Sequence, residues 1–428
     1  MSSLINSSYP FYIWIILDQL IRLLNMYNPQ VKILFDRKGQ ISTGNFSYPA
    51  RPIRYHRLET KELIMDLSIS WRPIFLQLNR NWPNPLEWLK ITLSGQPVYY
   101  SSLGYGDLAS LFEQFYVPCL LNDLETGGFF SHPEKKAACR AASLMNNLGT
   151  TLINSGLKKS LAKKIIRHQS YWQKFYKYEL TRLLQCRINV LPPDTMICDY
   201  DVYPIITATG CLYNCGFCKA KDGTEFLLRT PSQIKHQAES LAGLLGQETD
   251  TYKGLFIGNQ DGLNSPIELI GYACEIGSKL IPQLKNCFIF GSIESLLAKP
   301  DSFFADLEAT GLNTYINIGI ESVDKSVLNF IKKPVGLHAV RQALEKISRI
   351  NHTFPRIEIS CNILANSEFP SSHWQSLTEY LKNDPDTAKG PIYLSPFQQS
   401  INRKFFQLAK SIKRQTHRPI RIYNLIPL

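Results

Sequence analysis

The stretch Val202–Cys218, VYPIITATGCLYNCGFC, decides how this chain is interpreted. It begins with a run rich in β-branched and aromatic residues, Val202–Thr209, which is typical of a buried strand. It continues directly into a loop that contains Cys211, Cys215 and Cys218. A strand followed at once by three clustered thiols predicts a metal centre at the carboxyl end of that strand.

Outward from this stretch, short apolar runs alternate with helical patterns as far as about residue 400. The expected strands are Val202–Thr209, Gly254–Ile257, Cys287–Ile293, Thr314–Ile320, Arg356–Leu364 and Pro391–Leu394. Such alternation predicts βαβ units and a mostly parallel sheet, which right-handed crossovers curl into a full or partial barrel. We therefore expect an α/β fold with a partial (β/α)6 TIM-like barrel over residues 196–400, and an active site at the carboxyl ends of its strands.

The flanking segments have a different character. Residues 1–195 are expected to form a mainly helical N-terminal domain of unknown role, and Pro192–Pro193 marks its boundary. Residues 401–428 are expected to be a basic C-terminal extension. The helices expected in the N-terminal domain are Asp107–Val117, Pro133–Asn147 and Leu157–Arg187.

The spacing of the three thiols, C-x3-C-x2-C, allows them to converge on one metal centre. Three protein ligands leave one iron of a four-iron cubane open, and an open coordination position is where chemistry takes place. The alternative, a structural zinc site, needs a fourth ligand close by. The nearest further candidates are Cys198 and His236, thirteen residues before the loop and eighteen after it.

The C-x3-C-x-aromatic-C loop after a first barrel strand resembles the signature of the radical S-adenosylmethionine (SAM) superfamily. Within it, the chain is similar to the coproporphyrinogen-oxidase-like and elongator-like members. The resemblance implies a [4Fe–4S] cluster on Cys211, Cys215 and Cys218 whose fourth iron binds SAM. An electron from a flavodoxin- or ferredoxin-type donor then cleaves SAM, and the resulting 5′-deoxyadenosyl radical abstracts hydrogen from a substrate. The substrate is not indicated, and a small molecule is favoured.

The same resemblance implies which residues bind SAM. Phe217 lies where the family contacts adenine, and the turn Gly258-Asn259-Gln-Asp261-Gly262 lies where it receives the amino group. Glu321 and Ser322 match a run whose carboxylate accepts bonds from the ribose. Read by themselves, these residues are also consistent with an ordinary turn and a capping acid.

The fifth strand departs from the family pattern Gly-x-Ile-x-Gly-x-x-Glu. Here the residues are Cys361-Asn362-Ile-Leu-Ala365-Asn-Ser-Glu368, so both glycines are replaced. The bulkier Cys361 puts the approach of the backbone near Asn362 to adenine in doubt. Cys361 itself is either a small core residue or a donor of hydrogen to a substrate radical.

The net charge of +12 is concentrated in two segments. Residues 158–187 contain nine Lys/Arg and one acid, and residues 401–428 contain seven Lys/Arg and no acid. Basic residues interleaved with aromatic ones, such as Tyr171 and Trp172, suit tRNA binding through 158–187 and 403–421. They equally suit an amphipathic helix whose aromatic side chains face the core.

No run of about 20 apolar residues occurs, so we expect no integral membrane span. Clustered thiols in a large chain without an export signal favour a reducing compartment, and we expect a cytoplasmic protein. Three functions remain open: a radical SAM enzyme for a small molecule, a radical SAM enzyme that modifies tRNA, and a non-catalytic iron–sulfur protein. The Asp-x-His-x-x-Gly run of cobalamin-binding relatives is absent.

Overall fold

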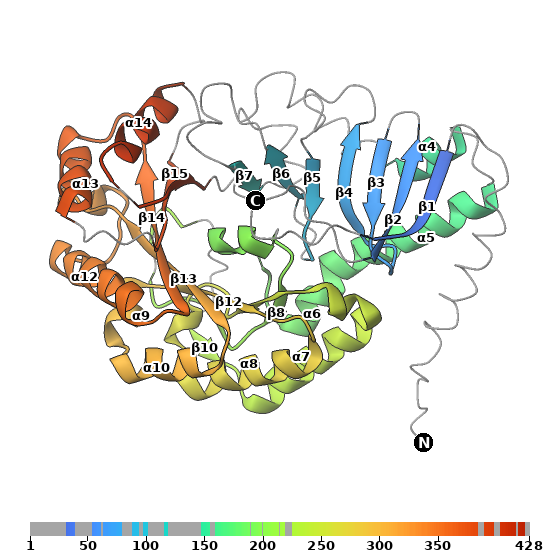
Figure 1. The fold of residues 1–428 in the computed structure, drawn as a ribbon, viewed down its shortest axis with the longest axis horizontal. Coiled ribbons are helices and arrows are strands. Elements are labelled where there is room, and N and C mark those ends of the chain that lie inside the picture. The colour runs from blue at the N-terminus through green and yellow to red at the C-terminus, as the bar shows by residue number, and fades with distance from the viewer. Residues whose placement is uncertain are drawn as a thin grey trace.

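The computed structural model shows two seven-stranded sheets and one two-stranded sheet, with helices around them (Figure 1). The residues that it describes are 31–38, 54–60, 63–78, 88–93, 97–101, 115–118, 147–154, 159–188, 190–198, 200–213, 215–218, 225–383, 389–397, 403–416 and 418–423. The expected helices over residues 107–114 and 133–146 lie outside these ranges.

The second half of the chain forms a parallel sheet in which consecutive strands lie side by side. Its strands are β8 (Tyr203–Ile205), β11 (Gly254–Ile257), β12 (Asn286–Gly291), β13 (Asn313–Glu321), β14 (Ile357–Ala365), β15 (Ile392–Pro396) and β16 (Ile420–Ile422). The α/β class and the parallel sheet are confirmed. The sheet has one strand more than expected because β16, from the basic C-terminal segment, pairs with β15. Among the described residues, its outermost strands β8 and β16 do not pair with each other.

Helices cover the outer face of the parallel sheet (Figure 1). They are α7 (Pro231–Leu245), α8 (Ile267–Leu280), α9 (Ile293–Ala298), α10 (Asp301–Ala309), α11 (Lys325–Phe330), α12 (Leu337–Thr353), α13 (Ser371–Asn383) and α14 (Arg403–Lys413). Capping boxes fix where two of them begin, with Thr230 before α7 and Ser292 before α9. The cap at Ser292 places the start of α9 directly after β12, at the carboxyl edge of the sheet.

Side chains along each strand alternate between the helices and the inside of the curved sheet. On the helix side, Tyr203 donates its hydroxyl to the carbonyl of Ala238 on α7 (2.6 Å). On the inner side, Asn317 of β13 donates to Ser360 Oγ (2.8 Å) and to Asn362 Oδ1 (3.2 Å) of β14. The inside of the sheet is therefore polar along β13 and β14.

The N-terminal part is where the structure differs most from expectation. Its strands form one antiparallel sheet in sequence order: β1 (Val31–Lys38), β2 (Arg54–Thr60), β3 (Leu63–Leu67), β4 (Pro73–Leu78), β5 (Trp88–Ile91), β6 (Pro97–Ser101) and β7 (Phe115–Pro118). The expectation of mainly helical structure is wrong for these residues, and the helix expected to reach Val117 is wrong because β7 covers that residue. Pairing between neighbouring short runs decides the structure here, and runs of four to eight residues do not reveal it.

Helices follow this sheet, as expected from residue 157 onward. They are α4 (Leu148–Asn154), α5 (Lys159–Lys174), the π-helical turn η2 (Phe175–Glu179) and α6 (Leu180–Leu184). Trp172 and Phe175 are buried, whereas Tyr171 and Tyr178 are 41% and 54% exposed. The amphipathic interpretation, in which aromatic side chains face the core, therefore holds for Trp172 and Phe175. It is wrong for Tyr171 and Tyr178.

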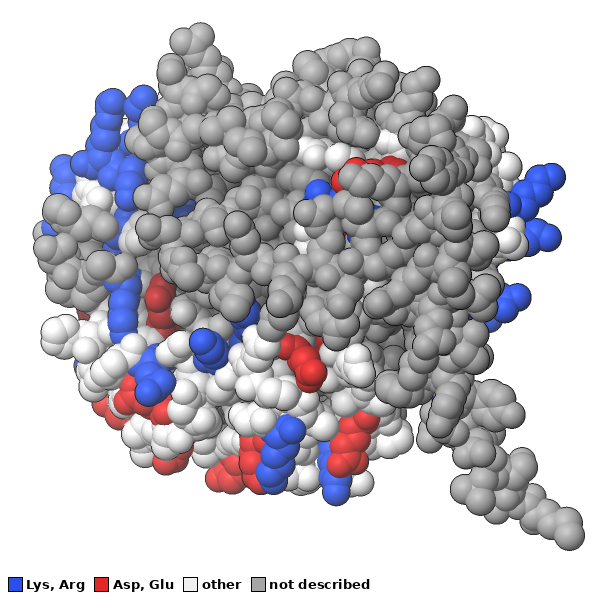
Figure 2. Space-filling model, turned by 45° about the vertical axis from the view of Figure 1, so that its right-hand side comes forward, with Lys and Arg blue, Asp and Glu red and all other residues white. Residues whose placement is uncertain are grey.

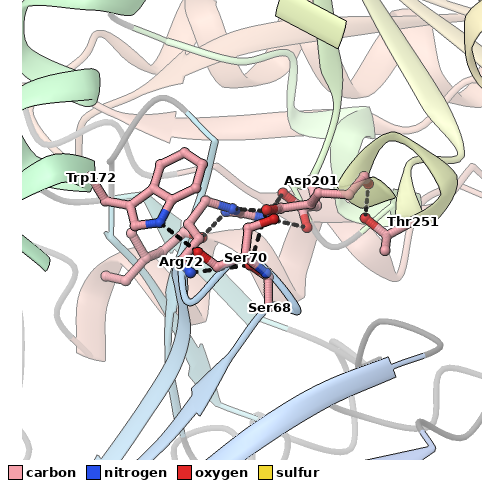
Figure 3. Close-up of polar contacts among 8 residues, drawn as sticks. Ser68, Ser70, Arg72, Trp172, Asp201 and Thr251 are labelled. Atoms are coloured by element: carbon pink, nitrogen blue, oxygen red, sulfur yellow. Dashed lines mark hydrogen bonds and ion pairs between the residues drawn. The ribbon is translucent and has the colours of Figure 1, made fainter. Parts of the chain in front are cut away.

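A buried ion pair joins the N-terminal sheet to the barrel (Figure 3). The guanidinium of Arg72 donates to Glu248, which follows α7, and to Asp201 before β8 (3.4 Å). Ser68 Oγ donates to the other oxygen of Glu248 (2.9 Å), and Trp172 Nε1 donates to the carbonyl of Ser70 (3.0 Å). Arg72 and Glu248 are both fully buried, so each charge depends on the other half of the molecule.

The segment between the two halves is also buried. The 3-10 helix η3 (Pro193–Cys198) inserts Asp194 beneath the parallel sheet, where Ser360 Oγ (2.6 Å) and Tyr393 OH (2.9 Å) both donate to its carboxyl group. Burial raises the pKa of Asp194 to about 7. Tyr423, just after β16, donates its hydroxyl to the carbonyl of Leu191 (2.6 Å). Residues 191–194 thus pack against β14, β15 and the residue that follows β16.

Charge is unevenly spread over the surface. In Figure 2, Lys and Arg gather at the upper left without Asp or Glu among them, whereas both signs alternate over the lower part. Lys410, Lys413 and Arg414 belong to the basic C-terminal helix α14 or follow it directly. Arg418 and Phe405 are buried, so part of this segment serves packing rather than surface charge.

Candidate functional site

The three-cysteine loop starts at the carboxyl edge of the parallel sheet. After β8 the chain forms the two-residue strand β9 (Ala208–Thr209), which pairs with β10 (Leu227–Leu228), and then turns at Gly210, whose φ is 78°. Cys211 is half-buried, Cys215 is buried and Cys218 is exposed. Cys218 N donates to the carbonyl of Cys215 (3.3 Å), which closes the second half of the loop into a turn.

Tyr213 fixes the loop to the neighbouring helix. The backbone N–H of Glu294, in the first turn of α9, donates to the Tyr213 hydroxyl (2.9 Å). The Tyr213 N–H points back to Cys211 Sγ (3.4 Å). The loop is therefore held at both the first cysteine and the start of α9.

Burial governs the protonation of these thiols. It raises the pKa of Cys211 to about 12 and also raises that of Cys215, although the nearby Lys333 partly lowers the latter. Without metal, both side chains are neutral thiols at pH 7. A metal that binds here must displace their protons, because only the thiolate is a ligand.

The spacing of the potential ligands bears on the size of the centre. Within the described ranges, no three His, Cys, Asp or Glu side chains lie close enough to hold one metal ion. Tetrahedral zinc needs its thiolates about 4 Å apart, because each Zn–S bond is about 2.3 Å. A cubane binds each thiolate through a different iron, so its ligands can lie further apart. Ligation by Cys211, Cys215 and Cys218 stays a prediction.

The turn after β11 brings a buried carboxyl group to the first cysteine. Gly258 has a φ of 77°, and a Cβ there would lie 2.3 Å from the Cα of Gly262, so the turn requires glycine. Asp261 is 1% exposed and acts electrostatically on Cys211. Its Oδ1 accepts from Ser292 N (3.0 Å) and Ser295 Oγ (2.8 Å).

The other oxygen of this carboxyl group, Asp261 Oδ2, is buried and has no hydrogen-bond partner among the described residues. Burial raises the pKa of Asp261, and the donors from Ser295 and Ser292 partly offset this. A buried acceptor without a donor is costly, so its retention indicates a ligand that donates to it. The expected Asn259 lies in the same turn and is also buried.

The end of β13 places a second acid near the loop. Glu321 has a φ of 67°, an uncommon backbone conformation for a residue other than glycine. Burial raises its pKa, and the positive charge of Lys333 partly lowers it again. Glu321 also acts electrostatically on Cys215, so the carboxyl group and the thiol share one region.

Ser322 and Asn362 have side chains that are engaged within the protein. Ser322 Oγ bonds to His373 Nδ1 (2.9 Å) and accepts from Asp324 N (3.0 Å). Asn362 exchanges amide hydrogen bonds with Asn317 (2.7 and 3.2 Å). These side chains are engaged at the edge of the site, and the backbone of Asn362 lies within the sheet, in register with Gly319 and Tyr393.

The side chain of Cys361 faces the helices rather than the inside of the sheet. It pairs in register with Ile318 and Ile392, on the helix-facing side of the sheet, because Ser360 and Asn362 on either side of it face inward. It is 1% exposed and belongs to the main apolar core. This placement favours the interpretation of Cys361 as a core residue over that of a hydrogen donor to a substrate radical.

Phe217 belongs to an aromatic cluster beside the loop. Its ring lies 6.4 Å from that of Phe397 in an edge-on arrangement, and Phe330 and Phe369 contact Phe397 in turn. Phe330 is 62% exposed, so the cluster reaches the surface. A cluster of aromatic rings next to the three-cysteine loop can contact a flat apolar group such as a purine.

Sequence reasoning did not single out Lys333. It follows α11 and is 8% exposed, with its ammonium 5.4 Å from the ring centre of Tyr213 and 6.0 Å from that of Phe217. The only signal was its place in the run Lys332-Lys333-Pro334. Together the structure brings Cys211, Cys215, Phe217, Asp261, Glu321 and Lys333 to one edge of the sheet.

Comparison with known proteins gives a partial picture. A scan against protein-family models and a search of curated proteins found no match. Among solved structures, methylornithine synthase is similar over 72% of this chain and 86% of that protein, with 11% identity and a TM-score of 0.34. Coproporphyrinogen III oxidase from Escherichia coli, a radical SAM enzyme, is similar over 50% of this chain, with 15% identity and a TM-score of 0.31.

The chain covers 46% of that oxidase, less than half of its length. A third structure, the cobalamin-dependent S-adenosylmethionine radical enzyme OxsB with aqua-cobalamin bound, is similar over 94% of this chain and 69% of that protein, with 12% identity and a TM-score of 0.37. No helix among the described residues is long and apolar enough to cross a membrane. At these identities and TM-scores, function has to be argued from this chain's own residues.

Proposed function

We propose that this chain is a radical SAM enzyme that holds a [4Fe–4S] cluster on Cys211, Cys215 and Cys218. The observation that carries the proposal is a C-x3-C-x2-C loop at the carboxyl edge of a parallel βα sheet, with buried groups of opposite charge beside it. Active sites of such sheets collect at this edge. Three thiols and no fourth ligand nearby suit a cubane with one open iron.

The charges around the loop fit the amino-acid part of SAM. Asp261 Oδ2 lacks a donor, and the Lys333 ammonium forms no hydrogen bond or ion pair with any described residue. An α-amino group supplies donors to a carboxylate, and an α-carboxylate supplies the negative charge that a buried ammonium lacks. Glu321 and the Phe217 cluster are then available to the ribose and the adenine.

When bound and reduced, the cluster supplies the electron that cleaves SAM into methionine and a 5′-deoxyadenosyl radical, which abstracts hydrogen from the substrate. The electron donor is a low-potential flavodoxin or ferredoxin type, and the substrate class favoured is a small molecule. We place the protein in the cytoplasm, since eight free cysteines among the described residues suit a reducing compartment.

Anaerobic reconstitution tests this proposal directly. The protein is loaded with iron and sulfide, reduced with dithionite and given SAM, and 5′-deoxyadenosine is then measured. We expect the nucleoside from the wild type. We expect neither the brown chromophore nor the product from Cys215→Ala, whereas Cys274→Ala, which alters a buried cysteine on α8, retains both. A loop that binds zinc and takes up no iron would overturn the proposal.

A second candidate, a radical SAM enzyme that modifies tRNA, is favoured by one observation on α5. Lys163, Arg167 and Lys174 are all exposed at helical spacing, and Tyr171 and Tyr178 are exposed along the same stripe. Ala162, Ile165 and Trp172 of this helix are buried, so these side chains are not available to a membrane. Phosphate contacts and base stacking are the interactions that such a stripe offers.

Salt dependence separates the two candidates. A tRNA-modifying enzyme binds tRNA with an affinity that falls steeply between 50 and 200 mM salt, and a combined Lys163/Lys164/Arg167→Ala variant flattens that dependence. Binding that is weak, insensitive to salt and unchanged in the variant favours a small-molecule substrate. A third candidate, a non-catalytic iron–sulfur protein, requires an assembled cluster that leaves SAM intact.

A further inference from the structure

Lys333 is a buried positive charge whose position is set by the backbone. Lys332 before it adopts a φ of 54°, and Lys333 N then donates to the carbonyl of Leu328 (3.0 Å), closing the end of α11. This turn leaves Lys332 exposed and sends the Lys333 side chain inward, where it is 8% exposed. Two adjacent lysines therefore occupy opposite environments.

The surroundings of this ammonium are the cysteine loop and the end of β13. It acts electrostatically on Cys215 and on Glu321, and a Cβ built on Gly319 would lie 3.8 Å from its Nζ. The ammonium group also lies over the aromatic rings of Tyr213 and Phe217. Among the described residues no carboxylate lies within ion-pair distance of it, so its charge is offset only in part, by the more distant Glu321.

A buried ammonium without an ion pair at contact distance is costly, so its place beside the cysteine loop indicates a task. A cation beside an iron–sulfur cluster favours the more negative, reduced state, and local charge is one of the factors that set cluster potentials. Burial keeps solvent and salt from screening this effect, whereas the charge of Lys332 on the surface is screened. Lys333 is therefore placed to act on a cluster held by Cys215.

We propose that Lys333 is a positioning residue that raises the reduction potential of the cluster, so that a cellular donor can reduce it. This inference rests on the proposed function. One electron passes from a low-potential flavodoxin- or ferredoxin-type donor, or from dithionite in the assay, to the cluster, whose core charge falls from 2+ to 1+. No proton or group is transferred, and the donor is oxidised by one electron.

A redox titration of the reconstituted protein without SAM tests the inference. In Lys333→Met, which keeps the length of the side chain and removes its charge, we expect a lower midpoint potential. At the wild-type midpoint, the ratio of reduced to oxidised cluster falls about tenfold, equivalent to about 59 mV for one electron. Lys333→Arg keeps the charge and stays within about threefold of the wild type.

Lys332→Met is the matched control, because it removes the same charge from the same turn at an exposed position. We expect its midpoint to match that of the wild type. Equal midpoints for Lys333→Met and the wild type, at equal iron and sulfide content, would overturn the inference alone. A wild type that assembles no [4Fe–4S] cluster would overturn the proposed function, and the inference with it.

Adding SAM gives a second readout. If the ligand carboxylate pairs with Lys333, the affinity for SAM falls about tenfold or more in Lys333→Met and is kept in Lys332→Met, as equilibrium dialysis measures. Equal affinities in the two variants would show that the carboxylate binds elsewhere and would overturn this part of the inference.

Discussion

Asp261 and Lys333 bring opposite charges to the same loop, and only one of them could be named from the sequence. Asp261 stands in a glycine-flanked turn directly after a strand, which is a recognisable position. Lys333 follows Lys332, and nothing in two adjacent lysines tells which one turns inward. That choice depends on the left-handed backbone at Lys332, which the sequence does not reveal.

Asp261→Asn removes the charge while it keeps an acceptor for Ser292 and Ser295. We expect the cluster to assemble and the affinity for SAM to fall about tenfold or more, because a hydrogen bond to a charged group is worth about 1.5–3 kcal/mol. Equilibrium dialysis of SAM against reconstituted protein measures this. Asp306→Asn, on the exposed face of α10, is the control, and equal affinities in both variants would contradict the assignment.

Strands were predicted well where long apolar runs alternate with helices, and poorly elsewhere. β11 to β15 begin and end within two residues of the predicted runs, because their residues are buried on both faces. The strand β16 was missed because its three residues, Ile420–Ile422, lie in a basic segment and gain their structure only from pairing with β15. The antiparallel sheet of β1 to β7 was missed for a similar reason, since its strands depend on pairing with one another.

The alternation of side chains along β14 decided what the sequence left open at Cys361. A residue in a strand faces one side or the other, but the sequence does not say which side holds the site when both sides are buried. Hydrogen bonds from Asn317 to Ser360 and Asn362 identify the inner face, and Cys361 lies on the other. Candidate residues on such strands can be assigned to a face only after one partner is known.

The contact of η3 with β14 and β15 predicts a specific pH dependence. Burial raises the pKa of Asp194 from 3.8 to about 7 in the folded protein, so the fold favours the protonated carboxyl group. Its contribution to stability is full below about pH 4 and is lost as pH rises to about 7, by about 1.4 kcal/mol per pH unit between these values. Above pH 7 the contribution stays constant.

Urea unfolding of the wild type and of Asp194→Asn at several pH values checks this. The variant lacks the titrating group. As pH rises from 4 to 7, the unfolding free energy of the wild type should therefore fall relative to that of the variant. Parallel pH profiles of the two proteins would show that Asp194 does not titrate in this range.

One core of buried apolar residues extends through both halves of the molecule, and the buried ion pair of Arg72 with Glu248 crosses their junction. Arg72→Ala leaves Glu248 buried without its cation, and we expect the free energy of unfolding to fall by about 3–5 kcal/mol. Chemical denaturation measures the change. Lys279→Ala breaks an exposed pair with Glu275 and should change the free energy of unfolding far less.

A double variant, Arg72→Met with Glu248→Met, distinguishes a lost attraction from an isolated buried charge. Removing both charges should restore much of the stability that Arg72→Ala loses. A double variant as unstable as the single one would show that shape, rather than charge, holds this junction together.

The buried segment with Leu191 and Asp194 has a consequence for the ancestry of the chain. Because it bonds to β14 and β15 and to Tyr423 beyond β16, the stretch that connects the two halves is also part of the barrel. A recombination event that exchanged the N-terminal sheet for another module would have to keep this segment, and the partners of Arg72 with it, or leave Ser360, Tyr393 and Tyr423 without these hydrogen bonds. We therefore expect relatives to inherit the two halves as a unit, with Arg72 and Glu248 varying together rather than separately.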